Sequence, residues 1–205
     1  MENDIDRVLW TEEEISRRVS ELASEISGDL GRTSSPTVIV GVATGALLFL
    51  ADIVRKIDLP VIVDFVRVES YGSGTESSGS PRITSDVKID VSGKHVVVIE
   101  DIVDTGNTVS CLISHFKSKG AHSISVCTFL DKPARRRVSV ELVGEGKFYR
   151  GFEVRHLRQD HMKQSLYPKI LECPDYFVVG YGMDYAEVYR NLPYVSVLKP
   201  EKYMN

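Results

Sequence analysis

One stretch of thirteen residues, Val96–Thr108, constrains the fold more than any other part of the chain. It begins with three valines and an isoleucine, a run that is typical of a strand buried on both faces of a parallel sheet. Glu100 and Asp101 follow directly, and a polar turn to Thr108 leads into residues with helical spacing. The stretch therefore predicts a strand, a turn and a helix in succession, which is the repeating unit of α/β folds.

The same alternation continues along the rest of the chain. Thr11 and Glu14 have the spacing of a capping box, and the apolar pattern that follows stops at Gly28, so we expect a first helix over residues 11–27. Further helices are expected over residues 46–56 and from the polar turn to about residue 119. Core strands are expected at 37–42, 60–68, 95–99, 124–130 and 177–180, an edge strand at 87–91, and lesser strands at 138–143, 148–153 and 195–198.

Length and charge limit the classes of function. A chain of 205 residues suits a single domain over 1–205, built on a parallel sheet. The 25 basic and 29 acidic residues leave a net charge of −4, so a general nucleic-acid binder is not expected. The one tight basic run, 135–137, is interpreted as a solvated strand lead-in or a subunit contact. We expect no membrane span, because no apolar run approaches about 20 residues, and three scattered cysteines indicate a reducing, cytoplasmic location.

The polar turn has the residues that a phosphate-binding loop needs. Gly106 allows close backbone approach to an anion, and helix-start amides with the hydroxyls of Thr105 and Thr108 form a phosphate cup. Glu100 and Asp101 would repel a phosphate, and they suit sugar hydroxyls or a hard cation such as Mg²⁺. Phosphoribosyl pyrophosphate carries a phosphate, a diol and a magnesium-binding group. The alternative is a strand that ends in a solvated acidic turn.

Several segments, in one order along the chain, resemble the type I phosphoribosyltransferases, and among them the hypoxanthine-guanine phosphoribosyltransferases. The resemblance implies an α/β fold: a parallel-sheet core with helices on both faces and a small hood formed by the N- and C-terminal segments. The residues that carry it are Glu100–Thr108, Ala43–Ala46, Phe49–Asp52, Ser70 and Tyr71, Leu130–Pro133, Phe177–Tyr185 and Tyr189–Leu192.

The resemblance also implies an activity. The family transfers the 5-phosphoribosyl group from phosphoribosyl pyrophosphate to N9 of hypoxanthine or guanine in purine salvage, giving IMP or GMP and pyrophosphate. It requires Mg²⁺ and assembles as homodimers or homotetramers. Two other hypotheses remain open: a regulator that binds phosphoribosyl pyrophosphate, and a relative that prefers xanthine or a pyrimidine.

Residue roles on the phosphoribosyl side follow from the same resemblance. Asp104 would be the general base at purine N7, unless it merely caps the following helix. Glu100 and Asp101 would hold the ribose hydroxyls and a magnesium ion. The expected phosphoribosyl and nucleotide contacts are Glu100, Asp101, Asp104, Thr105, Gly106, Asn107 and Thr108.

On the purine and pyrophosphate sides, the family has a lysine that donates to the purine 6-oxo group, here Lys132. Phe177 would stack on the base, Val178 would read its edge through main-chain groups, and Asp184 would belong to the purine segment and to a second magnesium position. Pyrophosphate would contact Thr44, Gly45 and Arg190, with a cis peptide between Ala43 and Thr44. Thr44 stands where many relatives have a basic residue.

Two loops complete the expectations. Ser70 and Tyr71 would begin a mobile lid over residues 71–81, which is rich in Gly and Ser. Residues 154–172 depart from the family pattern and are interpreted as an insertion that loops out on the surface. The open alternatives are a segment present in one transcript form and a segment that disturbs the purine pocket.

Overall fold

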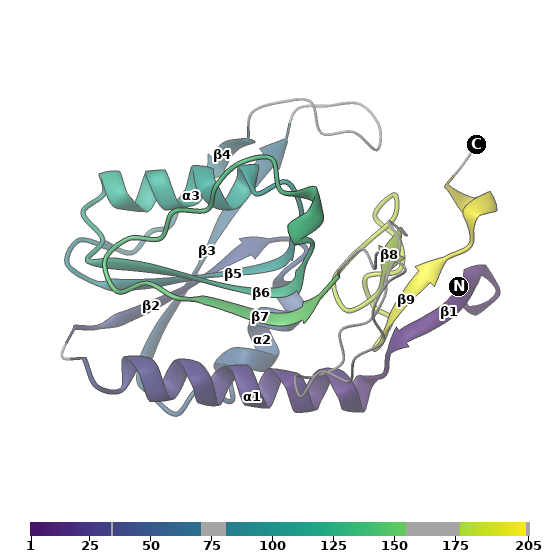
Figure 1. Ribbon diagram of the computed structural model, residues 1–205, viewed down its shortest axis with the longest axis horizontal. Coiled ribbons are helices and arrows are strands. Elements are labelled where there is room, and N and C mark those ends of the chain that lie inside the picture. The colour runs from purple at the N-terminus through teal and green to yellow at the C-terminus, as the bar shows by residue number, and fades with distance from the viewer. Residues whose placement is uncertain (34, 71–80, 155–176, 204–205) are drawn as a thin grey trace, which may run out of the picture.

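Six strands form a mostly parallel central sheet in the computed structural model, which describes residues 1–33, 35–70, 81–154 and 177–203 (Figure 1). The strand order is β4-β3-β2-β5-β6-β7, and every pair is parallel except β3 with the edge strand β4. The strands are β2 (Thr37–Ala43), β3 (Val61–Ser70), β4 (Pro81–Ser85), β5 (His95–Val103), β6 (Ser123–Asp131) and β7 (Phe148–Glu153).

Helices cover both faces of this sheet, as expected. Buried residues of α1 (Glu12–Leu30) and α2 (Leu47–Val54) pack in one apolar cluster, and those of α3 (Asn107–Ser118) pack in a second cluster on the opposite face (Figure 1). Single 3₁₀ turns occupy Glu2–Asp4, Pro133–Arg135 and Pro200–Lys202. Among the described residues, no helix combines the length and apolarity needed to cross a membrane.

The first helix begins as predicted and ends later. Thr11 and Glu14 form both hydrogen bonds of the capping box, at 3.1 and 3.3 Å. Gly28 does not stop the helix, which continues to Leu30 and has Gly31 as its C-cap. A methyl group at Gly28 would meet nothing within 4 Å, so Gly28 lies on an open face of the helix, where glycine weakens a helix without breaking it.

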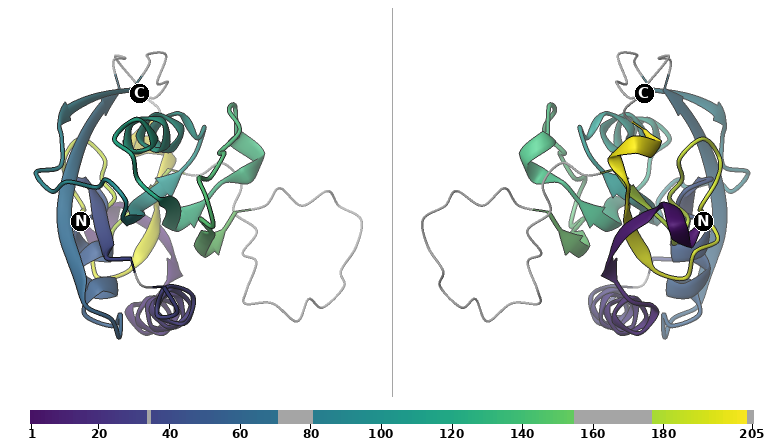
Figure 2. Two further views of the ribbon diagram at one scale, coloured as in Figure 1. Left: turned by 90° about the vertical axis from the view of Figure 1, so that its left-hand side faces the viewer. Right: turned by 90° about the vertical axis from the view of Figure 1, so that its right-hand side faces the viewer.

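A second sheet forms the hood from both ends of the chain. It consists of β1 (Ile5–Trp10), β9 (Val195–Leu198) and β8 (Val178–Val179), in that antiparallel order. Figure 2 shows β1 and β9 side by side. The prediction of a fifth core strand at 177–180 is therefore wrong, because the short β8 pairs with β9 outside the central sheet. The strand β1 was not predicted at all.

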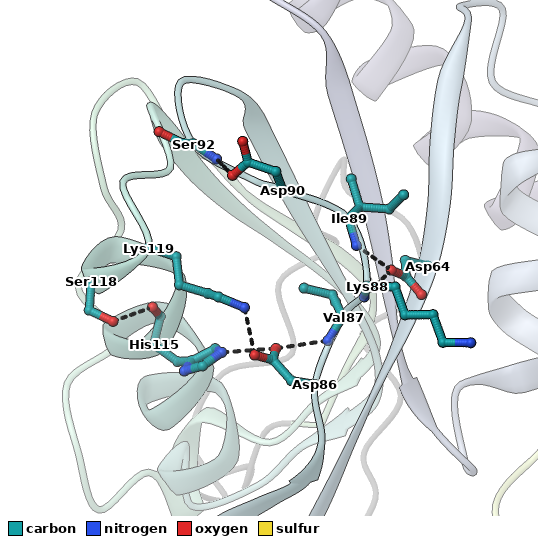
Figure 3. Close-up of polar contacts among 10 residues, drawn as sticks. All are labelled: Asp64, Asp86, Val87, Lys88, Ile89, Asp90, Ser92, His115, Ser118 and Lys119. Carbon is teal, nitrogen blue, oxygen red and sulfur yellow. Dashed lines mark hydrogen bonds and ion pairs between the residues drawn. The ribbon is translucent and has the colours of Figure 1, made fainter.

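The expected edge strand at 87–91 is also wrong, for an electrostatic reason. The Asp64 carboxylate accepts hydrogen bonds from the amides of Lys88 and Ile89, at 2.7 and 3.1 Å (Figure 3). Three backbone hydrogen bonds of this sort lower the pKa of Asp64, one of them from Phe65. Amides held by a carboxylate form no strand ladder, and β4 forms the edge of the sheet instead.

Figure 3 also shows the contacts of Asp86, the first residue of the connection between β4 and β5. The Asp86 carboxylate lies 2.5 Å from Lys119 Nζ and 2.9 Å from His115 Nε2, both close to the end of α3.

Of the two lesser strands near the other edge, 148–153 is confirmed as β7. The one at 138–143 is wrong, because its only sheet contact among the described residues is an isolated bridge between Val143 and Ile124.

The connections diverge between β2 and β5. The chain leaves β2 through α2 for β3 on one side, and leaves β5 through α3 for β6 on the other. Neighbouring strands whose connections run in opposite directions leave a crevice at their carboxyl ends, where open α/β sheets bind ligands. The loops after β2 and β5 are therefore the place to look for a site.

An aromatic cluster around Phe129 of β6 joins the sheet to the hood. The Phe129 side chain is 1% exposed, and its ring centroid lies 4.9 Å from Tyr181, 5.3 Å from Phe152, 5.6 Å from Phe49 and 6.3 Å from Trp10. The partners come from β1, α2, β7 and the segment after β8. This one side chain thus contacts the helix layer, the edge strand and the hood.

We predict that Phe129→Ala lowers the free energy of unfolding by about 3–5 kcal/mol, because it removes a buried ring that its rigid neighbours cannot replace. Urea denaturation at fixed protein concentration measures the change. Val8→Ala, which truncates a half-exposed side chain on β1, is the control and should cost less than about 1 kcal/mol. A loss below about 1 kcal/mol for Phe129→Ala would contradict the role assigned to the cluster.

Candidate active site

The loop after β2 lies directly against the end of β5. The peptide between Ala43 and Thr44 is cis, which confirms the expectation. A methyl group at Gly45 would overlap the carboxylate of Asp101, so only glycine lets the two segments approach this closely. Thr44 is exposed at the tip of the loop. Two predicted site segments that are far apart in sequence are thus in contact.

The turn that was predicted to bind a phosphate is shorter than expected. The turn was predicted to begin at Glu100, but β5 continues to Val103, because Ile102 and Val103 still pair with β6. Glu100 and Asp101 therefore lie on the strand, and only residues 104–106 form the turn into α3.

Gly106 is the N-cap of α3. Its φ of +86° lies in the left-handed region, which favours glycine. The Asn107 amide donates to Thr105 Oγ1 at 3.4 Å, and the Ser110 amide donates to Gly106 O at 2.9 Å. The helical amides before Ser110, including that of Thr108, have no partner within a helix and are suited to bind an anion. No side chain caps this helix, so capping is not what Asp104 does.

Glu100 is an acid of the site whose burial changes its pKa. Its side chain is buried, and Oε2 has no hydrogen-bond partner in the described part of the chain. Burial, reinforced by the neighbouring Asp101 carboxylate, raises the pKa of Glu100 well above its usual value. A buried carboxyl oxygen without a partner is costly, and a bound cation or hydroxyl would relieve that cost.

The pair Glu100 and Asp101 fits a magnesium site better than Asp184 does. Mg²⁺ is commonly held by one or two carboxylates with oxygens of a bound phosphate ester, so two adjacent acids suffice. Asp184 already has partners: Oδ1 lies 2.9 Å from Arg190 Nη2, and Oδ2 accepts from the Glu187 amide at 2.9 Å. Within the described ranges, no group of three or more His, Cys, Asp or Glu side chains forms a protein-only metal site.

Lys132 lies at the same edge of the sheet, directly after β6. Its amide donates to Val103 O at 3.0 Å, which ties it to the end of β5. The following basic run is not simply the solvated strand lead-in that was one of its two predictions, and the other, a subunit contact, stays a prediction. Arg135 and Arg136 are partly buried and bind acidic and carbonyl groups of this chain, including Asp104.

Arg190 is held beside the loop after β2 by the hood. Its Nη1 donates to Gly182 O at 2.8 Å, and its Nη2 lies 3.0 Å from Glu187 Oε2 in addition to Asp184. Gly182 in turn abuts the loop, since a methyl group there would overlap Gly45 O. The structure therefore brings Gly45, Gly182 and Arg190 together.

Phe177 and Val178 begin the hood segment. The Phe177 ring is partly buried, with centroid distances of 5.2 Å to Tyr185 and 5.4 Å to Tyr203. Val178 is buried and pairs with Val197 of β9. The Phe177 ring thus lies in an aromatic group of the hood, and stacking on a purine stays a prediction.

One contact at the site was missed by sequence reasoning. The Tyr181 hydroxyl donates to Asp52 Oδ2 of α2 at 2.8 Å, and burial with the nearby Asp52 raises the pKa of Tyr181. Both residues occur in the quoted family segments, but nothing in their spacing indicates that they meet. The contact fixes the hood on α2, the helix that follows the loop after β2.

Two expectations lie outside the described residues. Tyr71 and nearly all of the expected lid at 71–81 are among them, and so is the expected insertion at 154–172 apart from Val154. Ser70 ends β3. The lid and insertion therefore stay predictions.

Comparison with known proteins agrees with this geometry. The phosphoribosyl transferase domain family matches residues 10–159. The hypoxanthine-guanine phosphoribosyltransferase of Bacillus subtilis is 41% identical over 203 residues, 99% of this chain and 98% of the relative. The enzyme of the same name from Staphylococcus aureus is 38% identical over 205 residues, all of both chains. A crystal structure of a Staphylococcus aureus hypoxanthine phosphoribosyltransferase has a TM-score of 0.82 and 38% identity, and covers 100% of this chain and 97% of that one.

The fold and the turn after β5 define a transferase of the type I phosphoribosyltransferase class. The chain belongs to the phosphoribosyl transferase domain family, and the relatives described above are hypoxanthine-guanine enzymes of that family. The resemblance seen in the sequence motifs is thereby confirmed.

We predict that Glu100→Gln stabilises the ligand-free protein increasingly as pH rises. A carboxyl whose pKa is higher in the folded than in the unfolded state binds more protons when folded, so stability falls as pH rises above its ordinary pKa of 4.5. Glutamine cannot ionise, so the difference between variant and wild type should be smallest near pH 4.5 and grow through neutral pH until Glu100 is ionised in the folded state. Urea denaturation across this range measures it.

The exposed Glu141→Gln, which also removes one carboxylate, serves as the matched control. A Glu100→Gln curve parallel to wild type at all pH values would contradict the raised pKa.

Proposed function

We propose that this chain transfers the 5-phosphoribosyl group of phosphoribosyl pyrophosphate to N9 of hypoxanthine or guanine, releasing pyrophosphate. The observation that carries the proposal is the juxtaposition at the crevice between β2 and β5. There, a glycine-capped helix start suited to a phosphate lies beside the buried carboxyl group of Glu100, one oxygen of which has no hydrogen-bond partner in the described part of the chain. The names of the full-length relatives support the choice of purine.

Each part of the sugar ester has a matching group. The 5′-phosphate is assigned to the turn and first amides of α3, from Thr105 to Thr108. The ribose hydroxyls are assigned to Glu100 and Asp101, whose negative field also favours the positive ribosyl-like transition state. Pyrophosphate is assigned to Thr44 and Gly45, with Arg190 nearby to balance its charge. Thr44 offers a hydroxyl and no charge there.

Mg²⁺ is assigned to Glu100 and Asp101. When bound, it would neutralise negative charge on the pyrophosphate leaving group. Because burial raises the pKa of Glu100, a cation that binds its ionised form would release a proton wherever the ligand-free carboxyl is protonated. Asp184 would need to release Arg190 to serve as a further ligand.

On the purine side, Asp104 is assigned as the general base that takes or shares the N7 proton while the N9–ribose bond forms. Lys132 would donate to the 6-oxo group, which adenine lacks. Phe177 and Val178 would contact the base from the hood. Purine selectivity would thus come from groups on two separate sheets.

A second copy of the chain is the proposed partner, in a dimer or tetramer. Support comes from the exposed apolar side chains of Leu47, Val63 and Phe65 on α2 and β3, each more than two-fifths exposed. A monomer in light-scattering measurements at assay concentration would exclude this assembly. A cytoplasmic location is supported by Cys111 and Cys127, which are both free thiols.

The test of the activity is a set of parallel assays with phosphoribosyl pyrophosphate and hypoxanthine, guanine, xanthine, adenine or orotate. Nucleotide should form with hypoxanthine or guanine and not with adenine. Preferred turnover of xanthine or orotate would reassign the substrate. Binding of phosphoribosyl pyrophosphate without turnover of any base would favour the regulator instead.

We predict that Asp104→Asn lowers kcat by about 10²–10⁴-fold, because the amide cannot take a proton. The KM for phosphoribosyl pyrophosphate should change little, since the phosphate cup is intact. Steady-state kinetics with hypoxanthine measures both. Asparagine has nearly the same size and shape as aspartate, so an unchanged kcat would show that the carboxylate has no catalytic role.

We also predict that Lys132→Met raises the KM for hypoxanthine by about 10–100-fold, because a hydrogen bond from a charged donor is lost. Methionine keeps the length of the apolar stem. Lys117→Met on the exposed face of α3 is the matched control and should leave the KM unchanged. Equal KM values in all three proteins would remove Lys132 from the purine site.

A further inference from the structure

The basic run after Lys132 lies against the turn that carries Asp104. Arg135 Nε is 2.7 Å from Asp104 Oδ1, and Arg136 Nη1 donates to Asp104 O at 3.3 Å. The amides of Arg137 and Val138 both donate to Thr105 O, at 2.9 and 3.3 Å. Side chains and main chain of residues 135–138 therefore hold both Asp104 and the residue after it.

Arg136 is itself fixed on two sides. Its Nη2 forms a short ion pair with Asp131, which is 1% exposed and also accepts from Arg150 Nε at 2.8 Å. A methyl group at Gly106 would come within 2.8 Å of Arg136 Cδ, so the arginine stem lies on the glycine that caps α3. Truncating one partner of such a buried ion pair is costly, so this arginine forms a rigid base for the turn.

The exposure of Asp104 shows which carboxylate oxygen is open. The side chain as a whole is 38% exposed, yet Oδ1, the oxygen beside Arg135, is buried. The exposure therefore belongs to the rest of the group, with Oδ2 as its other polar atom. Oδ1 meets Arg135 as an ion pair that lacks hydrogen-bond geometry, so the contact depends on charge more than on the shape of the guanidinium.

We propose that Arg135 is a positioning residue, which turns the Asp104 carboxylate so that Oδ1 is held by the protein and Oδ2 is presented to the purine. The proposal rests on the catalytic role of Asp104 proposed above. The physical gain is orientation: a carboxylate that rotates freely presents its lone pairs to N7 only part of the time, and a misplaced catalytic group costs rate steeply. Arg135 follows Lys132 by three residues. One short segment would therefore carry the donor to the 6-oxo group and also position Asp104, the general base.

The test is a double-mutant cycle of Arg135→Gln and Asp104→Asn in the full chain, with kcat and KM measured for hypoxanthine and phosphoribosyl pyrophosphate. Arg135→Gln alone should lower kcat by about 10–100-fold and leave the KM for phosphoribosyl pyrophosphate within about twofold. In the Asp104→Asn background the same change should alter kcat by less than about twofold, because Arg135 acts through the missing carboxylate. Arg135→Lys should recover most of kcat, since it restores the charge.

Arg17→Gln, an exposed arginine on α1, is the matched control and should leave kcat unchanged. A kcat for Arg135→Gln within about twofold of wild type overturns the proposal, and so does an equal loss in both backgrounds. Failure of the proposed function looks different, because then Asp104→Asn would be as active as wild type or neither protein would turn over. In that case the crystal structure of Arg135→Gln decides: a carboxylate with Oδ1 still buried overturns the orienting role.

Discussion

The parallel pairing of β2 with β5 is the constraint on which the rest of the site depends. Paired residues run from Thr37 with His95 to Gly41 with Ile99, and the two chains then separate into different connections. Just beyond the last pair, the Asp101 carboxylate lies against Gly45, so close that a methyl group at Gly45 would overlap it. This contact sets the distance between the loop assigned to pyrophosphate and the strand end assigned to ribose.

The hood depends on that contact in turn. Gly182 abuts Gly45 from the hood side, Arg190 is held by Gly182, and Tyr181 reaches Asp52 on α2. Phe129 of the central sheet packs against Tyr181 and Trp10, so the hood is fixed through aromatic packing as well as hydrogen bonds. A site shared between two sheets is thus held by a few contacts that all lie within or directly beside it.

Charge is distributed unevenly around the crevice. Glu100 and Asp101 form an acidic floor, and the cost of burying it appears in the raised pKa of Glu100. Arginines pair with the acids around it: Arg135 with Asp104, Arg136 and Arg150 with Asp131, and Arg190 with Asp184. Buried and partly buried pairs of this kind add little net stability, and their value lies in fixed position. Among the described residues of this set, Glu100 and Asp101 are the two acids left without a cationic partner. A cation and hydroxyls are expected to bind there.

Local patterns in the sequence determined most of the core strands, the capping box, the turn after β5 and the family, because each depends on residues that are neighbours in the chain. The edge strand at 87–91 failed because the carboxylate of Asp64, more than twenty residues earlier, takes the amides of Lys88 and Ile89. The strand at 177–180 was placed in the wrong sheet. The observed strand β8 has only two residues, so its sequence does not indicate which strand it pairs with, and in the structure it pairs with β9.

The contacts of the basic run were missed for the same reason. Three adjacent arginines look alike in sequence, and only the fold decides that one meets Asp104, one meets Asp131 and the third stays exposed. The sequence by itself determined which chemical groups this protein has and which strand ends carry them. The tertiary structure alone decided which of those groups meet, because contacts across a hundred residues depend on packing between layers and leave no periodic trace in the chain.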